Sequence, residues 1–227
     1  MRALHEVQVL PSADAVAARA ARVLADAARE AVAARGRFRA AVSGGRTPWA
    51  MFARLADEEI PWPQVELWQV DERVVPRGDP ERNLDRLLAG VPPRADPAVH
   101  AMPVEEEDLV AAGRRYAAAL PEAFDLVHLG LGRDGHTASL FHGDPALEVV
   151  DADVAITGWH AGWRRMTLTY RGIARARRLL WLVTGPDKSP VLPLLLTGDP
   201  SIPAGRVRSR GSLVLADLAA ASALPRS

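Results

Sequence analysis

The chain has 227 residues, with 28 basic side chains, 28 acidic side chains, six histidines and no cysteine. A chain of this length fits one domain and buries enough surface to fold without a disulfide or a structural metal. Zero net charge argues against nucleic acid or an anionic membrane as a partner. The absence of cysteine excludes disulfides, thiolate catalysis and thiolate zinc sites.

The sequence also contains neither a candidate membrane-spanning helix nor a recognisable signal peptide. No apolar run approaches the ~20 residues that a membrane-spanning helix needs. The first ten residues lack a long apolar core and include His5 and Glu6, so they do not resemble a signal peptide. We therefore expect a cytoplasmic protein with one domain over residues 1–227, working as a monomer or a small homo-oligomer.

The first predicted element is a long amphipathic helix between Ser12 and Gly36. Apolar residues recur there at helical spacing, Ser12 suits the N-cap, and Gly36 suits the C-terminal stop. A short strand over 38–42 follows and leads into a glycine turn. Thr47 as N-cap and Pro48 as first helical residue predict the start of a second helix.

The alternation of strands and helices continues along the rest of the chain. Further strands are predicted at 65–70, 124–129, 154–157, 166–169 and 179–183, and helices at 83–89, 105–120, 172–177 and from about Lys188. This order predicts an α/β fold of the Rossmann-like class, with an open, mostly parallel twisted sheet and helices on both faces. Ligands bind such sheets at the carboxyl ends of the strands.

The first polar cluster, at the end of the 38–42 strand, reads Ser-Gly-Gly-Arg-Thr-Pro at 43–48. Glycines let the backbone approach a ligand, and the following helix N-terminus offers free N–H groups that suit a phosphate. A tight turn with a good cap explains the same residues. The spacing alone leaves both interpretations open.

The second cluster reads Asp-Glu-Arg at 71–73 and follows the predicted 65–70 strand. A carboxylate beside a fixed guanidinium can orient a substrate and bind an anion in a bidentate manner. A solvated run of surface charges is the alternative interpretation.

The third cluster, at 129–141, has three glycines in six residues and carries Asp134 and His136. Histidine is suited to accept a proton near neutral pH, and Asp134 could orient its ring. We expect His136 at the start of a following helix. A dinucleotide fingerprint fails here because the first strand-to-helix turn lacks its glycine pattern and no acidic residue closes a second strand. The other histidines lack metal-ligand spacing, so the sequence predicts no metal and no cofactor.

Lys188 is the only lysine among the 28 basic residues, and it follows the predicted 179–183 strand. Some sites need a compact ammonium where a planar guanidinium does not fit. The alternative is that Lys188 is a lysine only by chance, in a chain whose composition has drifted towards arginine.

Together these segments resemble the 6-phosphogluconolactonases. The resemblance rests on 43–48, on 71–73 with Asn83 downstream, on Arg-Met-Thr-Leu-Thr at 165–169, on Gly-Pro-Asp-Lys at 185–188, and above all on Gly-Leu-Gly-Arg-Asp-Gly-His-Thr-Ala-Ser-Leu-Phe at 130–141. It extends from about residue 38 to Asp217. The glucosamine-6-phosphate deaminases are similar, but they carry an aromatic residue where this chain has Arg73 and continue differently after His136.

The resemblance implies hydrolysis of a phosphorylated sugar lactone in the pentose phosphate pathway, with the sugar phosphate as a small-molecule partner. It implies His136 as the general base with Asp134 as its orienter. Substrate and phosphate contacts are then expected from Ser43, Gly44, Gly45, Thr47, Asp71, Arg73, Arg165 and Lys188. Oxyanion donors are left open between Gly44 or Gly45 and Gly132 with Gly135. The alternatives are a deaminase, with Asp71 as ring-handling base, and a non-catalytic sugar-phosphate-binding module.

Overall fold

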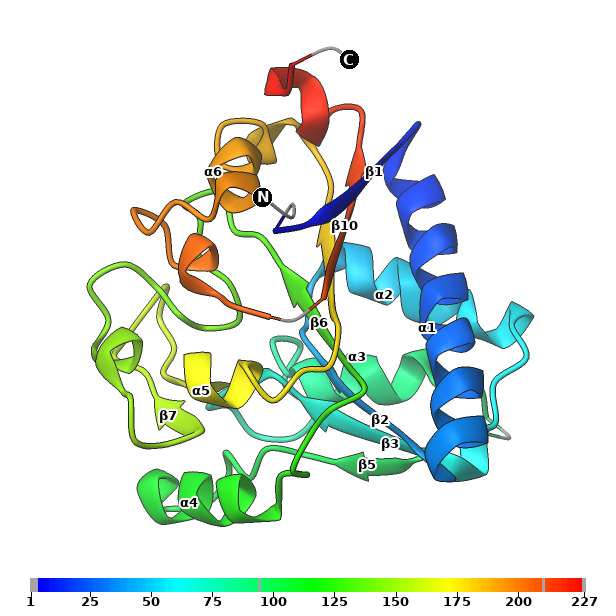
Figure 1. Ribbon diagram of the computed structural model, residues 1–227. Coiled ribbons are helices and arrows are strands. Elements are labelled where there is room, and N and C mark those ends of the chain that lie inside the picture. The colour runs from blue at the N-terminus through cyan, green and yellow to red at the C-terminus, as the bar shows by residue number, and fades with distance from the viewer. Residues whose placement is uncertain (1–3, 94, 210, 226–227) are drawn as a thin grey trace.

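The computed structural model describes residues 4–93, 95–209 and 211–225, and within them a seven-stranded sheet forms the centre (Figure 1). All neighbouring strands of this sheet run parallel, in the order β1-β10-β9-β6-β2-β3-β5. The strands are β1 (Glu6–Leu10), β2 (Phe38–Val42), β3 (Val65–Gln69), β5 (Ala98–His100), β6 (Leu126–Gly130), β9 (Leu179–Val183) and β10 (Ser212–Asp217). The predicted α/β class is confirmed.

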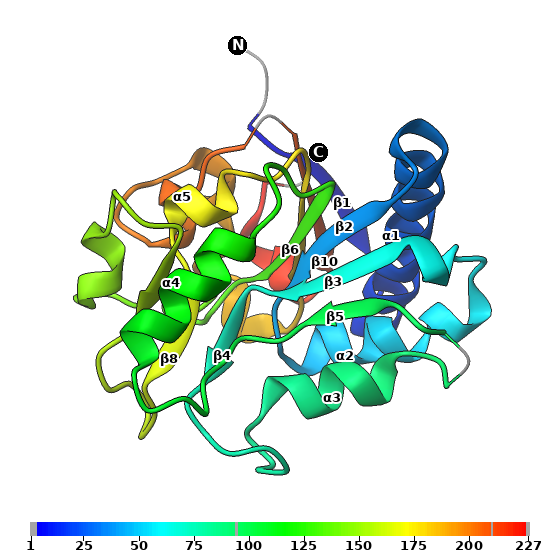
Figure 2. The same cartoon turned by 90° about the horizontal axis from the view of Figure 1, so that it is seen from below.

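Helices cover both faces of the sheet, as expected for parallel strands (Figures 1 and 2). One face carries α1 (Ala13–Arg35), α2 (Arg46–Ala53) and α3 (Asn83–Gly90), and the other carries α4 (Leu109–Ala119), α5 (Tyr170–Ile173) and α6 (Leu192–Thr197). Alternate side chains of each strand enter the two cores. In β9, Leu180 and Leu182 pack with α1, whereas Trp181 and Val183 pack in the opposite core.

Helix α1 has the caps that the sequence predicts. The Ser12 hydroxyl accepts from the Ala15 N–H at 3.2 Å, and Gly36 ends the helix in the left-handed region at φ 75°. Side-chain N-caps of this kind contribute about 1 kcal/mol to helix stability.

A second sheet, absent from the prediction, combines three short antiparallel strands in the order β4-β8-β7. These are β4 (Asp71–Arg73), β8 (Arg165–Leu168) and β7 (Val154–Ile156). The sequence placed 71–73 after the 65–70 strand without assigning it a strand of its own, and it predicted the other two strands as part of the alternating pattern. The connection from β7 to β8 turns at Ala161 and Gly162, both with positive φ, and carries no crossover helix, so the two strands pair antiparallel.

The chain order creates a crevice between β2 and β6. From β2 the chain runs outward to β3 and β5, returns to β6 on the other side of β2, and continues to β9 and β10. The carboxyl ends of strands at such a reversal are where open α/β sheets bind ligands. Among the described helices, none is long and apolar enough to cross a membrane.

Candidate active site

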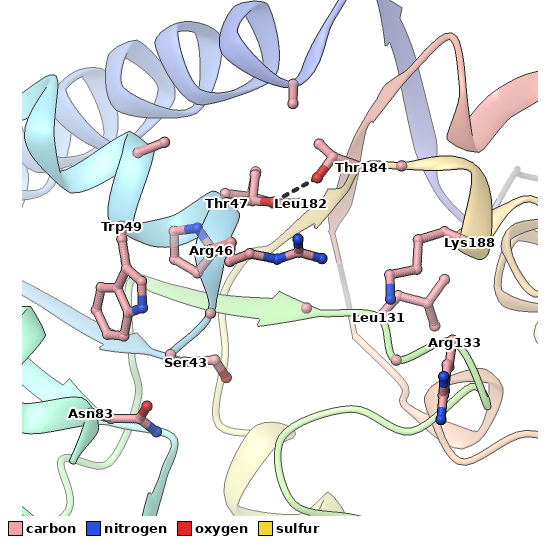
Figure 3. A pocket seen from close by; sticks show the side chains of 18 of the residues that line it. Ser43, Arg46, Thr47, Trp49, Asn83, Leu131, Arg133, Leu182, Thr184 and Lys188 are labelled. Atoms are coloured by element: carbon pink, nitrogen blue, oxygen red, sulfur yellow. Dashed lines mark hydrogen bonds between the residues drawn. The ribbon is translucent and has the colours of Figure 1, made fainter. Parts of the chain in front are cut away.

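A cleft of about 970 Å³ lies at the carboxyl ends of β2, β6 and β9 (Figure 3). The three predicted clusters and the segment before α6 all contribute to its wall. Its lining includes these predicted site residues: Ser43, Gly44, Gly45, Thr47, Asp71, Arg73, His136, Arg165 and Lys188. Asp134 is not part of the lining, but its side chain contacts His136.

His136 and Asp134 form the pair that the sequence predicts. Nδ1 of His136 lies 2.5 Å from Oδ1 of Asp134, and the His136 N–H donates to the same oxygen at 3.3 Å. A neutral imidazole held in this way carries its proton on Nδ1 and keeps Nε2 free as an acceptor. The pair can therefore present a proton acceptor to the cleft.

Several groups act on the protonation of His136. Burial lowers its pKa from the ordinary value, while the charges of Asp134 and Asp71 act in the opposite direction and Arg165 lowers it further. Partial burial of Asp134 raises its pKa, but the contacts with His136 outweigh this and hold the pKa below its usual value. His136 is thus kept neutral, and Asp134 ionised, at neutral pH.

The local structure around His136 differs from the prediction. Residues 131–144 form turns, with a single bridge between Thr137 and Leu140, and His136 does not start a helix. The glycines allow the chain to fold back on itself, since the N–H of Gly132 donates to the His136 carbonyl at 2.8 Å. The His136 ring packs against Phe141, with ring centroids 4.7 Å apart.

Backbone hydrogen bonds distinguish the candidate oxyanion donors. The N–H of Gly132 is used by His136, and that of Gly135 donates to the Gly132 carbonyl at 3.0 Å. No described residue accepts from the N–H groups of Gly44 or Gly45. The free backbone donors therefore lie on the loop after β2.

Helix α2 begins earlier than predicted. Gly45, with φ 136°, is its N-cap, and the helix has no side-chain cap. The hydroxyl of Thr47 instead lies 2.6 Å from the hydroxyl of Thr184, after β9 (Figure 3). The predicted N-cap role of Thr47 is wrong, because the helix already begins at Arg46 and the Thr47 hydroxyl instead bonds Thr184 in the loop after β9.

The cluster at 71–73 is strand β4, with Glu72 buried and its two neighbours half-buried, rather than a solvated run of surface charges. Oδ2 of Asp71 accepts from the Ser139 hydroxyl at 2.7 Å. Arg73 donates to the Glu81 carbonyl at 2.8 Å and to Oδ1 of Asn83 at 3.2 Å. Arg165 stands directly opposite Arg73 in the β4–β8 pair, so two guanidiniums border the same part of the cleft.

Glu72, between these residues, is fully buried and organises the start of α3. Its carboxylate accepts from Gln69 Nε2 and from three backbone N–H groups, those of Arg73, Asn83 and Leu84. Burial raises its pKa, against these hydrogen bonds. This side chain places Asn83 beside Gly44, where a Cβ would lie 2.2 Å from Oδ1 of Asn83.

Lys188 ends a 3-10 turn, Pro186–Lys188, where the sequence predicted the start of a helix. Its ammonium lies 2.8 Å from Oδ2 of Asp187, and the contact with Lys188 lowers the pKa of Asp187. The turn is anchored by Asp217, whose carboxylate accepts from the Gly185 N–H at 3.1 Å and the Ala220 N–H at 2.7 Å.

The chain is similar to known proteins over most of its length. The sequence profile described as glucosamine-6-phosphate isomerases/6-phosphogluconolactonase matches residues 11–215. The chain belongs to this family. A 6-phosphogluconolactonase from Streptomyces coelicolor is 36% identical over 246 residues, covering 95% of this chain and 91% of its own.

Solved structures of the glucosamine-6-phosphate isomerase/6-phosphogluconolactonase family share the fold. A 6-phosphogluconolactonase from Shewanella baltica matches with a TM-score of 0.85 and 26% identity over 95% of this chain and 100% of its own. A monomeric glucosamine-6-phosphate deaminase matches with a TM-score of 0.80 and 20% identity over 96% of this chain and 99% of its own. The fold therefore does not separate the two activities, and the site must do so.

Several cleft residues carry no role in the sequence analysis. Arg46 and Arg133 lie inside the two glycine segments and line the cleft. Their position inside the motifs could have indicated that they line the site, but arginine is so frequent in this chain that two more did not stand out. Within the described residues, no group of three His, Asp or Glu side chains is placed to hold a metal ion.

Proposed function

We infer that this single-domain chain hydrolyses 6-phosphoglucono-1,5-lactone to 6-phosphogluconate. The observation that carries the proposal is the His136–Asp134 pair at 2.5 Å on the wall of a cleft that also carries free backbone N–H groups and Lys188. Hydrolysis of a phosphorylated lactone needs a base that deprotonates water, hydrogen-bond donors that stabilise the oxyanion, and groups that bind the remote phosphate. Each of these is available from residues of this cleft.

In the proposed reaction, Nε2 of His136 takes a proton from a water molecule as the oxygen attacks the lactone carbonyl carbon. The tetrahedral oxyanion is stabilised by backbone donors, for which Gly44 and Gly45 are available. Collapse breaks the bond between the carbonyl carbon and the ring oxygen, and the proton on Nε2 passes to that oxygen. That transfer returns His136 to its neutral form, and the product carboxylic acid releases its proton to solvent.

Asp134 holds the imidazole in the tautomer that this step requires, and Asp71 is placed to accept from sugar hydroxyls. Ser43, directly after β2, and Thr47, in the first turn of α2, belong to the segment assigned to the phosphate. Arg73, Arg165 and Lys188 are the predicted phosphate contacts, on the strength of the family resemblance.

The test is an assay of the purified chain with freshly prepared 6-phosphogluconolactone, coupled to oxidation of 6-phosphogluconate. A rate well above spontaneous hydrolysis supports the proposal. Ammonia release from glucosamine 6-phosphate without lactonase activity would instead indicate a deaminase. Binding of 6-phosphogluconate with neither activity would indicate a non-catalytic sugar-phosphate-binding module.

A further inference from the structure

The turn at 137–140 directly follows His136 and connects the two sheets of the molecule. On one side, the hydroxyl of Thr137 donates to the carbonyl of Gly130, the last residue of β6, at 2.9 Å. On the other side, Ser139 makes the contacts with the second sheet. The segment that carries the proposed base is therefore held by both sheets.

Ser139 attaches this turn to the second sheet through two hydrogen bonds. Its side chain is fully buried, and its hydroxyl donates to Oδ2 of Asp71 at 2.7 Å. Its N–H donates to the hydroxyl oxygen of Thr167, which stands opposite Asp71 in the β4–β8 pair, at 3.2 Å. Phe141 adds a cation–π contact with Arg165, whose guanidinium carbon lies 4.8 Å from the ring centroid. Of these contacts, that of the serine hydroxyl is the one made with a carboxylate of the cleft.

Ala138, inside this turn, has an unfavourable backbone conformation. Its φ is 51°, in the left-handed region, where a residue other than glycine is strained. Such a conformation persists only where the surrounding contacts impose it. The hydroxyls of Thr137 and Ser139 are hydrogen-bonded on either side of Ala138, and they supply these contacts. The turn is thus fixed rather than free to adapt, and so is the backbone of His136 directly before it.

The hydroxyl of Ser139 engages only one oxygen of the Asp71 carboxylate. Among the described residues, none donates a hydrogen bond to Oδ1 of Asp71, and this residue lines the cleft. Asp71 also lies close to the proposed base. Burial lowers the pKa values of His136 and of Arg165, and the negative charge of Asp71 raises both. The carboxylate therefore has one oxygen fixed by the protein and one available to a ligand beside the base.

We propose that Ser139 is a positioning residue of the cleft, because its hydroxyl fixes the carboxylate of Asp71 so that Oδ1 accepts from a sugar hydroxyl of the substrate. A carboxylate already held at one oxygen loses less rotational freedom on binding, and it places the lactone ring relative to His136 on the same segment. Ser139 is fully buried and does not itself touch the substrate. This role rests on the proposed lactonase function and adds to it a residue that acts through Asp71.

The test is a double-mutant cycle of Ser139→Ala and Asp71→Ala, measured as kcat/KM for 6-phosphogluconolactone. Ser139→Ala should lower kcat/KM by about 10-fold to 100-fold, as the loss of a charge-assisted hydrogen bond implies. In the Asp71→Ala background the same change should have an effect of less than about 3-fold, because the carboxylate that the hydroxyl orients is gone. Thr137→Val is the matched control. It removes a buried hydroxyl of the same turn that donates to a backbone carbonyl, so its effect should be the same in both backgrounds.

Unchanged kcat/KM in Ser139→Ala would overturn the proposal. So would an equal loss with and without Asp71, since the hydroxyl would then only hold the turn. The same cycle for the affinity of 6-phosphogluconate, measured by calorimetric titration, separates this inference from the lactonase function and decides the case in which Asp71→Ala leaves no measurable turnover. A chain without lactonase activity in which Ser139→Ala weakens binding only when Asp71 is present would refute the function and keep the positioning role. No loss of affinity, or an equal loss in both backgrounds, would refute that role.

Discussion

Gly132 leaves room for His136, because a Cβ atom at Gly132 would lie 2.1 Å from Nδ1 of the histidine. The same Cβ would lie 2.6 Å from Oδ1 of Asp134. Both distances are far below van der Waals contact, and Gly132 also holds the histidine carbonyl through its N–H. The glycine is therefore required by the close approach of His136 and Asp134 rather than by a special backbone angle.

Gly132→Ala should reduce kcat by about 10²-fold, because displacing a reacting group by an ångström has effects of that size. Gly130→Ala is the matched control, since nothing lies within 4 Å of a Cβ at Gly130. Lactonase rates and circular dichroism of both variants check this prediction. Similar kcat values for the two variants would contradict it.

His136→Ala should lose about 10²–10⁴-fold in kcat, the usual contribution of positioned proton transfer. Binding of 6-phosphogluconate should change little, because His136 is not assigned to the phosphate. Initial rates must be corrected for the spontaneous hydrolysis of the lactone. Activity equal to the parent after this correction would refute the role of His136 as base.

Asp134→Asn should move the acid limb of the pH profile of kcat/KM to lower pH. The base works only when neutral, and Asp134 raises the pKa of His136 against the effect of burial. Removal of that charge lowers the pKa further, so activity persists at lower pH. The maximum rate should fall because the amide no longer fixes the tautomer. An acid limb that stays in place, or moves up, would show that Asp134 does not act on the base.

Local signals were enough to predict the elements whose ends are set by their own residues. Ser12 and Gly36 mark α1 through a cap and a left-handed glycine, and the apolar run of β9 predicted that strand with its observed bounds. The edge strand β1 was not predicted, since its partner β10 lies about 200 residues away in the chain. Strand β4 was missed for the same reason, because it exists only through its pairing with β8.

At the site too, contacts between residues close in the chain could be predicted, whereas contacts between distant segments could not. His136 and Asp134 are two residues apart, so their contact could be proposed from the motif. The bond between the Thr47 and Thr184 hydroxyls joins positions 137 residues apart, and neither segment alone indicates it. Arg46 and Arg133 likewise line one cleft only because segments after different strands meet at the carboxyl ends of the sheet.

Lys188→Arg should weaken binding of 6-phosphogluconate by about 10-fold or more, although it preserves the charge. The side chain of Lys188 is 19% exposed, and its ammonium lies 2.8 Å from Asp187 in the cleft that Arg46 and Arg133 also line. A larger planar guanidinium there competes with two existing ones for space. Titration of Lys188→Arg beside Lys188→Ala measures the effect. Parental affinity in Lys188→Arg would show that any cation suffices and that the single lysine is a chance survivor.

Acid should destabilise the folded protein through His128, which lies fully buried in β6 below the loop after β2. Its Nδ1 accepts from the Ser43 N–H at 3.3 Å, and burial lowers its pKa to about 3. Above pH 6.5 the imidazole is neutral in both states. Below that pH, His128 binds a proton in the unfolded chain but not in the folded protein, so the free energy of unfolding falls as pH falls.

Between pH 7 and pH 5 this single group should cost about 2 kcal/mol of unfolding free energy. His128→Asn keeps an acceptor for the Ser43 N–H but does not titrate. It should therefore lose less stability than the parent over that range, by about the same amount. The lowered pKa values of His5, His100 and His136 act in the same direction, and they are retained in the variant. Urea unfolding of both proteins at the two pH values measures the difference, and equal losses would exclude His128 as a source of acid sensitivity.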